Sequence, residues 1–271
     1  MAIPKDFKGR AKRLDDVDLP KLGALIGVGE DEIHAVLDVE SRGSGFDRLG
    51  RPAMLFEPHL FWRELGAGER RDKAVKAGLA YPAWKSGAYP ADSYPRLLQA
   101  MAIDERAALR SASWGLGQVL GSHHAALGFP TVQQMVAAFC DDEEAHLLAM
   151  VRFIQVNHLD DELRRHDWAT FARYYNGPGY AKNRYDVRLA AAFSRWKGIR
   201  DTKWSPSDAE AETRRNDAIL QQIAAEGQKR PATSELPIPA PAPAPDPAPA
   251  RGGSLWADLL ASILALFRRP A

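Results

Sequence analysis

Three short stretches combine carboxyl, amide or phenol groups with glycine, and they contain the residues that could do chemistry. They are Val39-Glu-Ser-Arg-Gly-Ser-Gly-Phe46, Ser111-Ala-Ser-Trp-Gly-Leu-Gly-Gln-Val119 and Tyr174-Tyr-Asn-Gly-Pro-Gly-Tyr180. Glycine lets a backbone approach a ligand closely, and polar side chains beside it could donate or accept hydrogen bonds or transfer a proton. The chain has no Cys/His nucleophile arrangement and no phosphate-binding glycine loop to compete with them.

The first stretch offers a carboxyl group at the end of a helix. Glu40 follows the apolar segment Ala35-Val-Leu-Asp-Val39 within a helix predicted over residues 31–41. We expect Glu40 to be partly buried, and desolvation then raises the pKa of its carboxyl group. A carboxyl group that stays protonated near neutral pH is suited to general acid catalysis of glycoside cleavage. The alternative is a glutamate that ends a helix and faces water.

The other two stretches supply groups that could contact a sugar. The Gln118 amide offers both a donor and an acceptor, and clustered tyrosines beside Asn176 could form a platform for a sugar face. Simpler interpretations stay open: a tight loop between helices around Gln118, and a helix end followed by a turn at Asn176.

Four segments in a fixed order carry a family resemblance. They are Leu37–Phe46, Met54–Phe61, Ser111–Gly121 and Tyr175–Tyr185. Together they resemble the phage endolysin N-acetylmuramidase family, within the superfamily of goose-type lysozymes and lytic transglycosylases, from about Lys21 to Lys197. The resemblance implies a lysozyme-like fold and cleavage of the β-1,4 bond between N-acetylmuramic acid and N-acetylglucosamine in bacterial peptidoglycan.

The resemblance also assigns roles to residues. Glu40 corresponds to the family's catalytic glutamate, which protonates the glycosidic oxygen. Gly117 is a departure, because the wider superfamily often has methionine there, and we expect the loop before Gln118 to pack more loosely. The residues expected to bind substrate are Ser41, Asp47, Gln118, Tyr175, Asn176 and Tyr180.

Two acids could provide the second carboxylate. We expect Glu57, at the end of an extended segment, to activate or position water, with Asp47 as the second candidate. An inverting hydrolase separates its carboxyl groups by about 6.5–9.5 Å, and a retaining one by about 5–5.5 Å. Alternatively, Glu57 forms an ion pair with Arg51 or Arg63, and Asp47 only caps its turn.

Two other functions stay open. If neither acid lies near Glu40, the acetamido group of the substrate could act as nucleophile, and the enzyme would be a lytic transglycosylase that releases 1,6-anhydro products. The chain could also be a non-catalytic peptidoglycan-binding, membrane-tethered protein that keeps a lysozyme-like scaffold.

The periodicity of apolar residues predicts a mainly α fold, a helical domain with a small β-hairpin. The resemblance implies that this fold is lysozyme-like α+β. Helices are expected over residues 19–26, 31–41, 131–139, 142–157, 168–175 (capped by Asp167) and 181–197, and an extended segment over residues 52–57. The catalytic domain would cover residues 1–200. A polar helical extension over 201–230, a Pro/Ala-rich linker over 231–253 and an amphipathic helix over 254–271 would follow.

Composition excludes several protein classes. The 271 residues carry a net charge of +1, without the basic excess of proteins that coat nucleic acid. Cys140 is the single cysteine, which excludes a disulfide framework and multi-cysteine metal sites, and no His-x-x-x-His pattern occurs. We therefore expect no metal, no cofactor and no nucleic acid partner. The resemblance implies peptidoglycan as the partner, and we expect a monomer.

The last segment is apolar on one side and polar on the other. Asp258, Ser262, Ala265 and Arg269 fall on one side of a helix, while leucines, Ile263 and Phe267 cover the opposite side. The apolar run is shorter than the roughly 20 residues that span a bilayer. It suits a helix lying on a membrane surface, with docking on the domain or dimerisation as alternatives.

The N-terminus contains no apolar run of signal-peptide length. We expect synthesis in the bacterial host cytoplasm and action on periplasmic peptidoglycan after release. A phage, prophage or secretion-system origin fits this expectation equally well.

Overall fold

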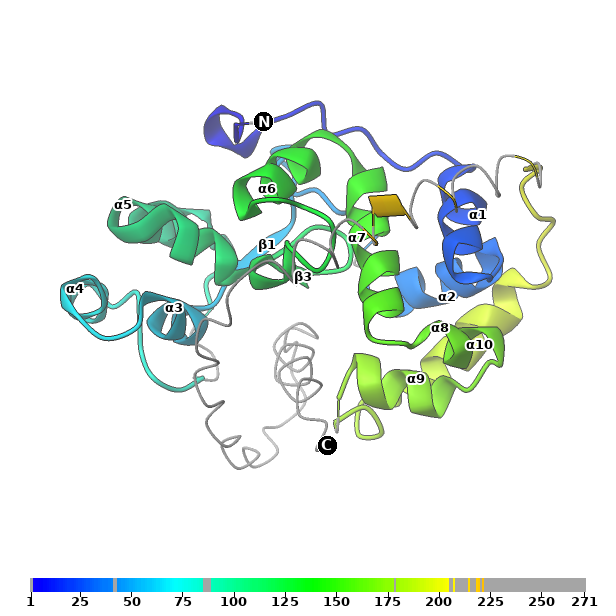
Figure 1. The fold of residues 1–271 in the computed structure, drawn as a ribbon. Helices are drawn as coiled ribbons and strands as arrows, with labels where there is room; N and C mark the ends of the chain where they lie inside the picture. Colours follow the sequence, from blue (N-terminus) through cyan, green and yellow to red (C-terminus); the bar gives the residue numbers. More distant parts are fainter. Residues whose placement is uncertain are drawn as a thin grey trace. The chain divides into compact units, whose positions relative to one another are not determined.

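The computed structural model describes residues 2–40, 43–84, 89–177 and 179–204, together with the single positions Ser207, Arg214, Ala218, Ile219 and Gln221. Two units make up the chain, one from residues 1–18 and 40–153 and the other from residues 19–39 and 154–271. Figure 1 shows the helices and strands of both. The linker and terminal helix predicted over 231–253 and 254–271 lie outside the described residues, as does most of the 201–230 extension.

The first unit packs helices around a small sheet. Its helices are α3 (Pro58–Leu65), α4 (Glu69–Lys76), α5 (Tyr94–Arg110), α6 (Val132–Asp141) and α7 (Glu143–Val156, the last three residues of which belong to the second unit), with the 3₁₀ turns η1 (Lys5–Phe7) and η3 (Gly121–His123). Helix α3 packs against both α4 and α5 (Figure 1). The mainly helical fold is therefore confirmed, although α3, α4 and α5 were not among the predicted helices.

The sheet has three short antiparallel strands, β1 (Met54–Phe56), β2 (Ala112–Trp114) and β3 (Val119–Leu120), in that order. The predicted extended segment is β1, and its partner is β2, with Met54 opposite Trp114. Trp114 is fully buried and its indole N–H donates to the Leu109 carbonyl at 3.0 Å. The stretch interpreted as a possible loop around Gln118 thus forms two of the three strands and the turn between them.

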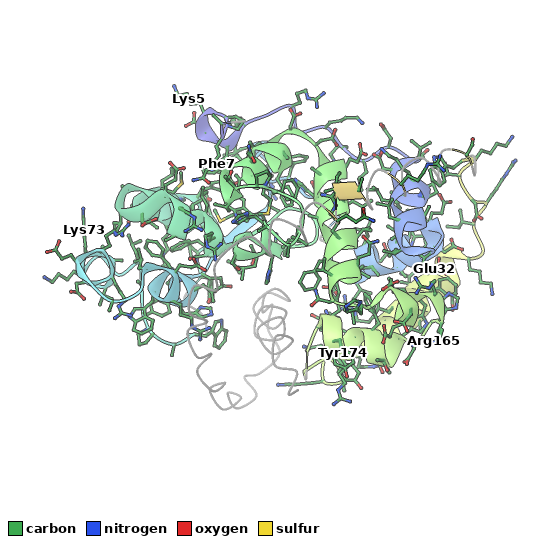
Figure 2. The ribbon with its side chains drawn as sticks, in the orientation of Figure 1. Lys5, Phe7, Glu32, Lys73, Arg165 and Tyr174 are labelled. Carbon is green, nitrogen blue, oxygen red and sulfur yellow. The ribbon has the colours of Figure 1, made fainter. Side chains whose placement is uncertain are left out.

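The N-terminal segment packs on this unit through one aromatic side chain. The Phe7 ring lies 5.1 Å from the ring of Tyr94 and 5.9 Å from that of Trp114. Figure 2 shows Phe7 on the inner side of η1 and Lys5 on its outer side. Burial of Phe7 therefore attaches the first residues to the core that contains the sheet.

Glu143, at the start of α7, fixes the loop that follows Glu40. Its carboxylate accepts hydrogen bonds from the Gly45 N–H at 2.7 Å, from the Leu14 N–H at 3.1 Å and from the Arg13 Nε–H at 2.9 Å. The Glu143 side chain is nearly fully buried. Three donors around one buried carboxylate offset its desolvation.

His146, one turn later on α7, fixes the loop between β2 and β3. Its Nδ1 accepts a hydrogen bond from the Leu116 N–H at 3.2 Å, and its Nε2 lies 2.7 Å from the Phe139 carbonyl oxygen. Because Nδ1 accepts and Nε2 donates, the ring is neutral. Burial lowers the pKa of His146 to about 4, in agreement with that state. At Gly115 (φ +70°), a Cβ atom would lie 2.8 Å from this ring, so the loop needs glycine there.

The regular elements in the described part of the second unit are all helices. It contains α1 (Asp18–Gly23, beginning one residue inside the first unit), η2 (Ala24–Ile26), α2 (Glu30–Glu40, whose last residue belongs to the first unit), α8 (Asp160–Arg164), α9 (Trp168–Tyr175) and α10 (Tyr185–Trp196). The Asp167 side chain accepts the Thr170 N–H at 3.1 Å and caps α9 as predicted. Helix α10 begins four residues later than predicted, because Arg184 before it is in the left-handed region.

We predict that the free energy of unfolding falls as the pH is lowered from about 6.5 toward about 4. Between these values the unfolded chain protonates His146 and the folded chain does not, so protons stabilise the unfolded state. Across this pH range His146 lowers the free energy of unfolding by about 3 kcal/mol in total, because its pKa changes from 6.5 to about 4 and each pKa unit corresponds to about 1.36 kcal/mol. Above about pH 6.5 its contribution is constant.

Thermal unfolding at a series of pH values measures this effect. His146→Gln should be less stable at neutral pH and should depend less steeply on pH. His158→Gln, at an exposed position, should keep the wild-type dependence. An equally steep dependence in His146→Gln would show that His146 is not its source.

Candidate active site

Glu40 is a buried carboxyl group at the carboxyl end of a helix. Acidic residues occupy the first turn of α2, where the helix dipole favours them. The helix then buries Val36 and Val39 and ends at Glu40, which is only 4% exposed. The carboxyl group therefore does not face water. Gly43, at φ +85°, turns the chain shortly after it, and Ser41 lies outside the described residues.

Asp47 uses its side chain to close the turn after this loop. It accepts the Leu49 and Arg51 backbone N–H groups at 2.8 and 3.0 Å. Its Oδ2 also accepts the Arg51 Nε–H at 2.7 Å, and Arg51 forms a further ion pair with Asp92 at 3.3 Å. These contacts match the interpretation of Asp47 as a turn-capping residue.

Gln118 connects the turn of the sheet to the segment before β1. Its Nε2 donates to the Gly115 carbonyl at 2.8 Å and to the Ala53 carbonyl at 3.2 Å. The residue has φ +46°, an uncommon value for a residue other than glycine, and is 4% exposed. The side-chain amide donor is thus engaged within the protein, and Gln118 shapes the loop around it.

Glu57 is fully buried where β1 ends and α3 begins. Its N–H donates to the Ser111 carbonyl at 3.0 Å, and its own carbonyl accepts the Leu60 and Phe61 N–H groups of the first turn of α3, both at 3.0 Å. The Glu57 side chain does not cap the helix. It is turned to Tyr89, whose hydroxyl donates to Oε2 at 2.5 Å.

The surroundings of Glu57 are aromatic and partly charged. The His59 Nδ1 lies 3.4 Å from Oε2. Burial raises the pKa of Tyr89 far above its usual range, and the charge of Glu57 raises it further, with Arg96 partly opposing the rise. Burial and Glu57 also raise the pKa of Tyr81. Glu57 and the two tyrosines therefore lie within electrostatic reach of one another.

The remaining predicted residues belong to the second unit. Tyr175 is 3% exposed and stacks on Phe171 at a centroid distance of 5.1 Å. Asn176 ends α9 and is 1% exposed, while Tyr180 is half-buried in the turn that follows. Tyr174, labelled in Figure 2, lies near the end of the same helix. Asn176 thus forms the helix end that was the simpler interpretation of this stretch.

Three residues that shape these segments were not expected from the sequence. Tyr89 is the donor to Glu57, and Glu143 and His146 hold the two glycine-containing loops. The only sequence signal for the latter pair is their spacing of three on a helix, which places both side chains on one face. Tyr89 has no motif that marks it.

No group of three or more His, Cys, Asp or Glu side chains able to hold a metal ion occurs within the described ranges. Cys140 is buried, and burial raises the pKa of its thiol to about 12, which fits a structural residue. Across the part of the chain that the structure covers, no helix is long and apolar enough to cross a bilayer.

Comparisons with known proteins identify the family of this chain. The profile of the N-acetylmuramidase family matches residues 30–197. Among solved structures, the endolysin of the Burkholderia AP3 phage is similar, with a TM-score of 0.64 and 38% sequence identity over 69% of this chain and 73% of that chain. A search of curated proteins finds no match. Because the family profile covers more than half of its length, the chain belongs to the N-acetylmuramidase family.

Proposed function

We propose that this protein hydrolyses the β-1,4 bond between N-acetylmuramic acid and N-acetylglucosamine in bacterial peptidoglycan, with Glu40 as the general acid. Family membership supports a peptidoglycan hydrolase of the lysozyme type. The observation that carries the role of Glu40 is its burial, at 4% exposure, as the last residue of α2.

The position of Glu40 suits a proton donor for two physical reasons. Removal from water disfavours the ionised form of a carboxyl group. The carboxyl end of a helix carries partial negative charge, which disfavours a second negative charge there. Both effects favour the neutral acid, which is the form that protonates the leaving glycosidic oxygen.

Glu57 is our candidate for the second carboxylate. It directly precedes α3, and its Oε2 accepts a hydrogen bond from the Tyr89 hydroxyl. In the proposed reaction Glu40 gives its proton to the leaving oxygen, which keeps the electron pair of the broken bond. Water adds to the anomeric carbon and gives a proton to Glu57. Glu57 then releases its proton to solvent, and Glu40 takes up a proton from solvent, which restores both groups.

We propose two roles for the six substrate-binding candidates. Asp47 and Gln118 fix their loops through hydrogen bonds within the protein. Ser41, Tyr175, Asn176 and Tyr180 keep the role that the family resemblance implies, which is contact with the glycan.

We predict that Glu40→Gln lowers the release of fragments from purified peptidoglycan by about 100- to 10,000-fold, the usual contribution of general acid catalysis. Glutamine keeps the size of the side chain and loses only the transferable proton. Asp38→Asn is the matched control, because Asp38 lies on the same helix and is exposed. Full activity of Glu40→Gln with normal folding would exclude Glu40 as the acid. Loss of activity in both variants would point to the helix instead of the carboxyl group.

We also propose that residues 254–271 bind a membrane surface, and that the protein reaches peptidoglycan after release from the cytoplasm of its host as a monomer. The apolar side of the predicted helix supports surface binding, because buried apolar area and basic residues both attract a helix to anionic lipid.

Sedimentation with vesicles of phosphatidylglycerol and phosphatidylethanolamine tests whether residues 254–271 bind a membrane surface. We predict that the full chain binds, that removal of residues 251–271 abolishes binding, and that Ile263→Asp weakens it strongly. Ser262→Asp adds the same charge on the polar side and should have a much smaller effect. Unchanged binding after the deletion would contradict the proposal.

A further inference from the structure

The two oxygens of the buried Glu57 carboxylate have different surroundings. Oε2 accepts the Tyr89 hydroxyl at 2.5 Å and lies 3.4 Å from the His59 Nδ1. Oε1 is buried and has no hydrogen-bond partner among the described residues. A buried carboxylate oxygen is expensive to leave without a donor, so an oxygen of this kind indicates a place for water or substrate.

Tyr89 can serve Glu57 only as a donor. Burial and the neighbouring negative charge raise the pKa of the Tyr89 phenol well above its usual range, so the hydroxyl stays protonated. Its hydrogen points to Oε2, which lies 2.5 Å from the hydroxyl oxygen. The hydrogen bond therefore runs from Tyr89 to Glu57, and it fixes the rotation of the carboxylate about its Cγ–Cδ bond.

His59 does not provide the same restraint. Its Nδ1 is 3.4 Å from Oε2, longer than the usual range for a nitrogen donor, and this atom has no hydrogen bond within the part of the chain that the structure covers. Tyr89 is thus the close donor that the structure gives to Glu57.

We propose that Tyr89 is a positioning residue that holds Oε2 of Glu57, so that Oε1 is presented to the water that attacks the anomeric carbon. The inference rests on the proposed function, in which Glu57 accepts a proton from that water. The proton goes to Oε1, the water oxygen forms the new bond to carbon, and the leaving oxygen takes the proton of Glu40. Tyr89 keeps its own proton throughout.

The test uses Tyr89→Phe in the full chain, which keeps the ring and removes only the hydroxyl. We expect kcat on soluble peptidoglycan fragments to fall by about 10- to 100-fold with little change in KM, because a misplacement of about 1 Å can cost about 100-fold. We also expect a larger share of 1,6-anhydro ends among the products, since activation of water is impaired while protonation by Glu40 is not.

Tyr94→Phe is the matched control. Tyr94 is also a buried tyrosine of the first unit, and its hydroxyl donates to the Pro52 carbonyl at 2.7 Å. Its loss should lower the unfolding temperature and leave kcat and the product ends nearly unchanged. Equal effects of the two variants on kcat and products would overturn the proposal, because they would reflect stability alone.

A double-mutant cycle keeps the proposal falsifiable even if Tyr89→Phe is less stable. If Tyr89 acts through Glu57, Tyr89→Phe has no further effect on kcat per folded molecule in the Glu57→Gln background. Independent, multiplicative losses would overturn the proposal. The proposed function has a separate test, because an active Glu40→Gln variant would reject it. An unchanged kcat of Tyr89→Phe beside an inactive Glu40→Gln would reject only the role of Tyr89.

Discussion

The proposed chemistry depends on two buried carboxyl groups, one at the carboxyl end of a helix and one before the amino end of another. Glu40 is the last residue of α2, where the partial negative charge of the helix end favours a neutral carboxyl group, and Glu57 directly precedes α3, with Tyr89 donating to its Oε2. Water is removed from both side chains. Acid and base roles require that two such groups have different environments. We propose that α2, which belongs to the second unit up to Val39, and α3 of the first unit provide these two environments.

Glu143 and Glu57 are buried carboxylates that differ in their hydrogen bonding. Glu143 accepts hydrogen bonds from two backbone N–H groups and one guanidinium, and the bond from the Gly45 N–H holds the loop after Glu40 against α7. Glu57 has one close donor, Tyr89, and one oxygen without a partner among the described residues. Full hydrogen bonding makes Glu143 a fixed part of the fold, whereas Glu57 keeps an oxygen for a further donor.

Local sequence signals predicted the elements that local forces form. The apolar spacing before Glu40 gave α2 to within a residue, and Asp167 caps α9 as expected. Helix α4 was not predicted because its sequence, Glu-Arg-Arg-Asp-Lys-Ala-Val-Lys, has almost no apolar stripe. The pairing of β1 with β2 joins three-residue segments far apart in the chain, for which periodicity gives no signal.

For the candidate site, too, the sequence indicated local features but not the contacts between residues far apart in the chain. The glycines and the acids Glu40 and Glu57 could be recognised in the sequence, but not the residues that contact these segments: Glu143 is 98 positions from Gly45, and Tyr89 is 32 positions from Glu57. Asp47 and Gln118 were expected to bind substrate, and their side chains already hydrogen-bond within the protein. The sequence identifies a polar residue, whereas only the fold shows which partner that residue hydrogen-bonds.

We propose that Glu40 and a water molecule cleave the bond on the reducing side of N-acetylmuramic acid. Mass spectrometry of peptidoglycan digested in heavy-oxygen water distinguishes this reaction from transglycosylation. We expect fragments that end in reducing N-acetylmuramic acid and carry one heavy oxygen from the solvent. Unlabelled 1,6-anhydro ends, or label at reducing N-acetylglucosamine, would rule it out.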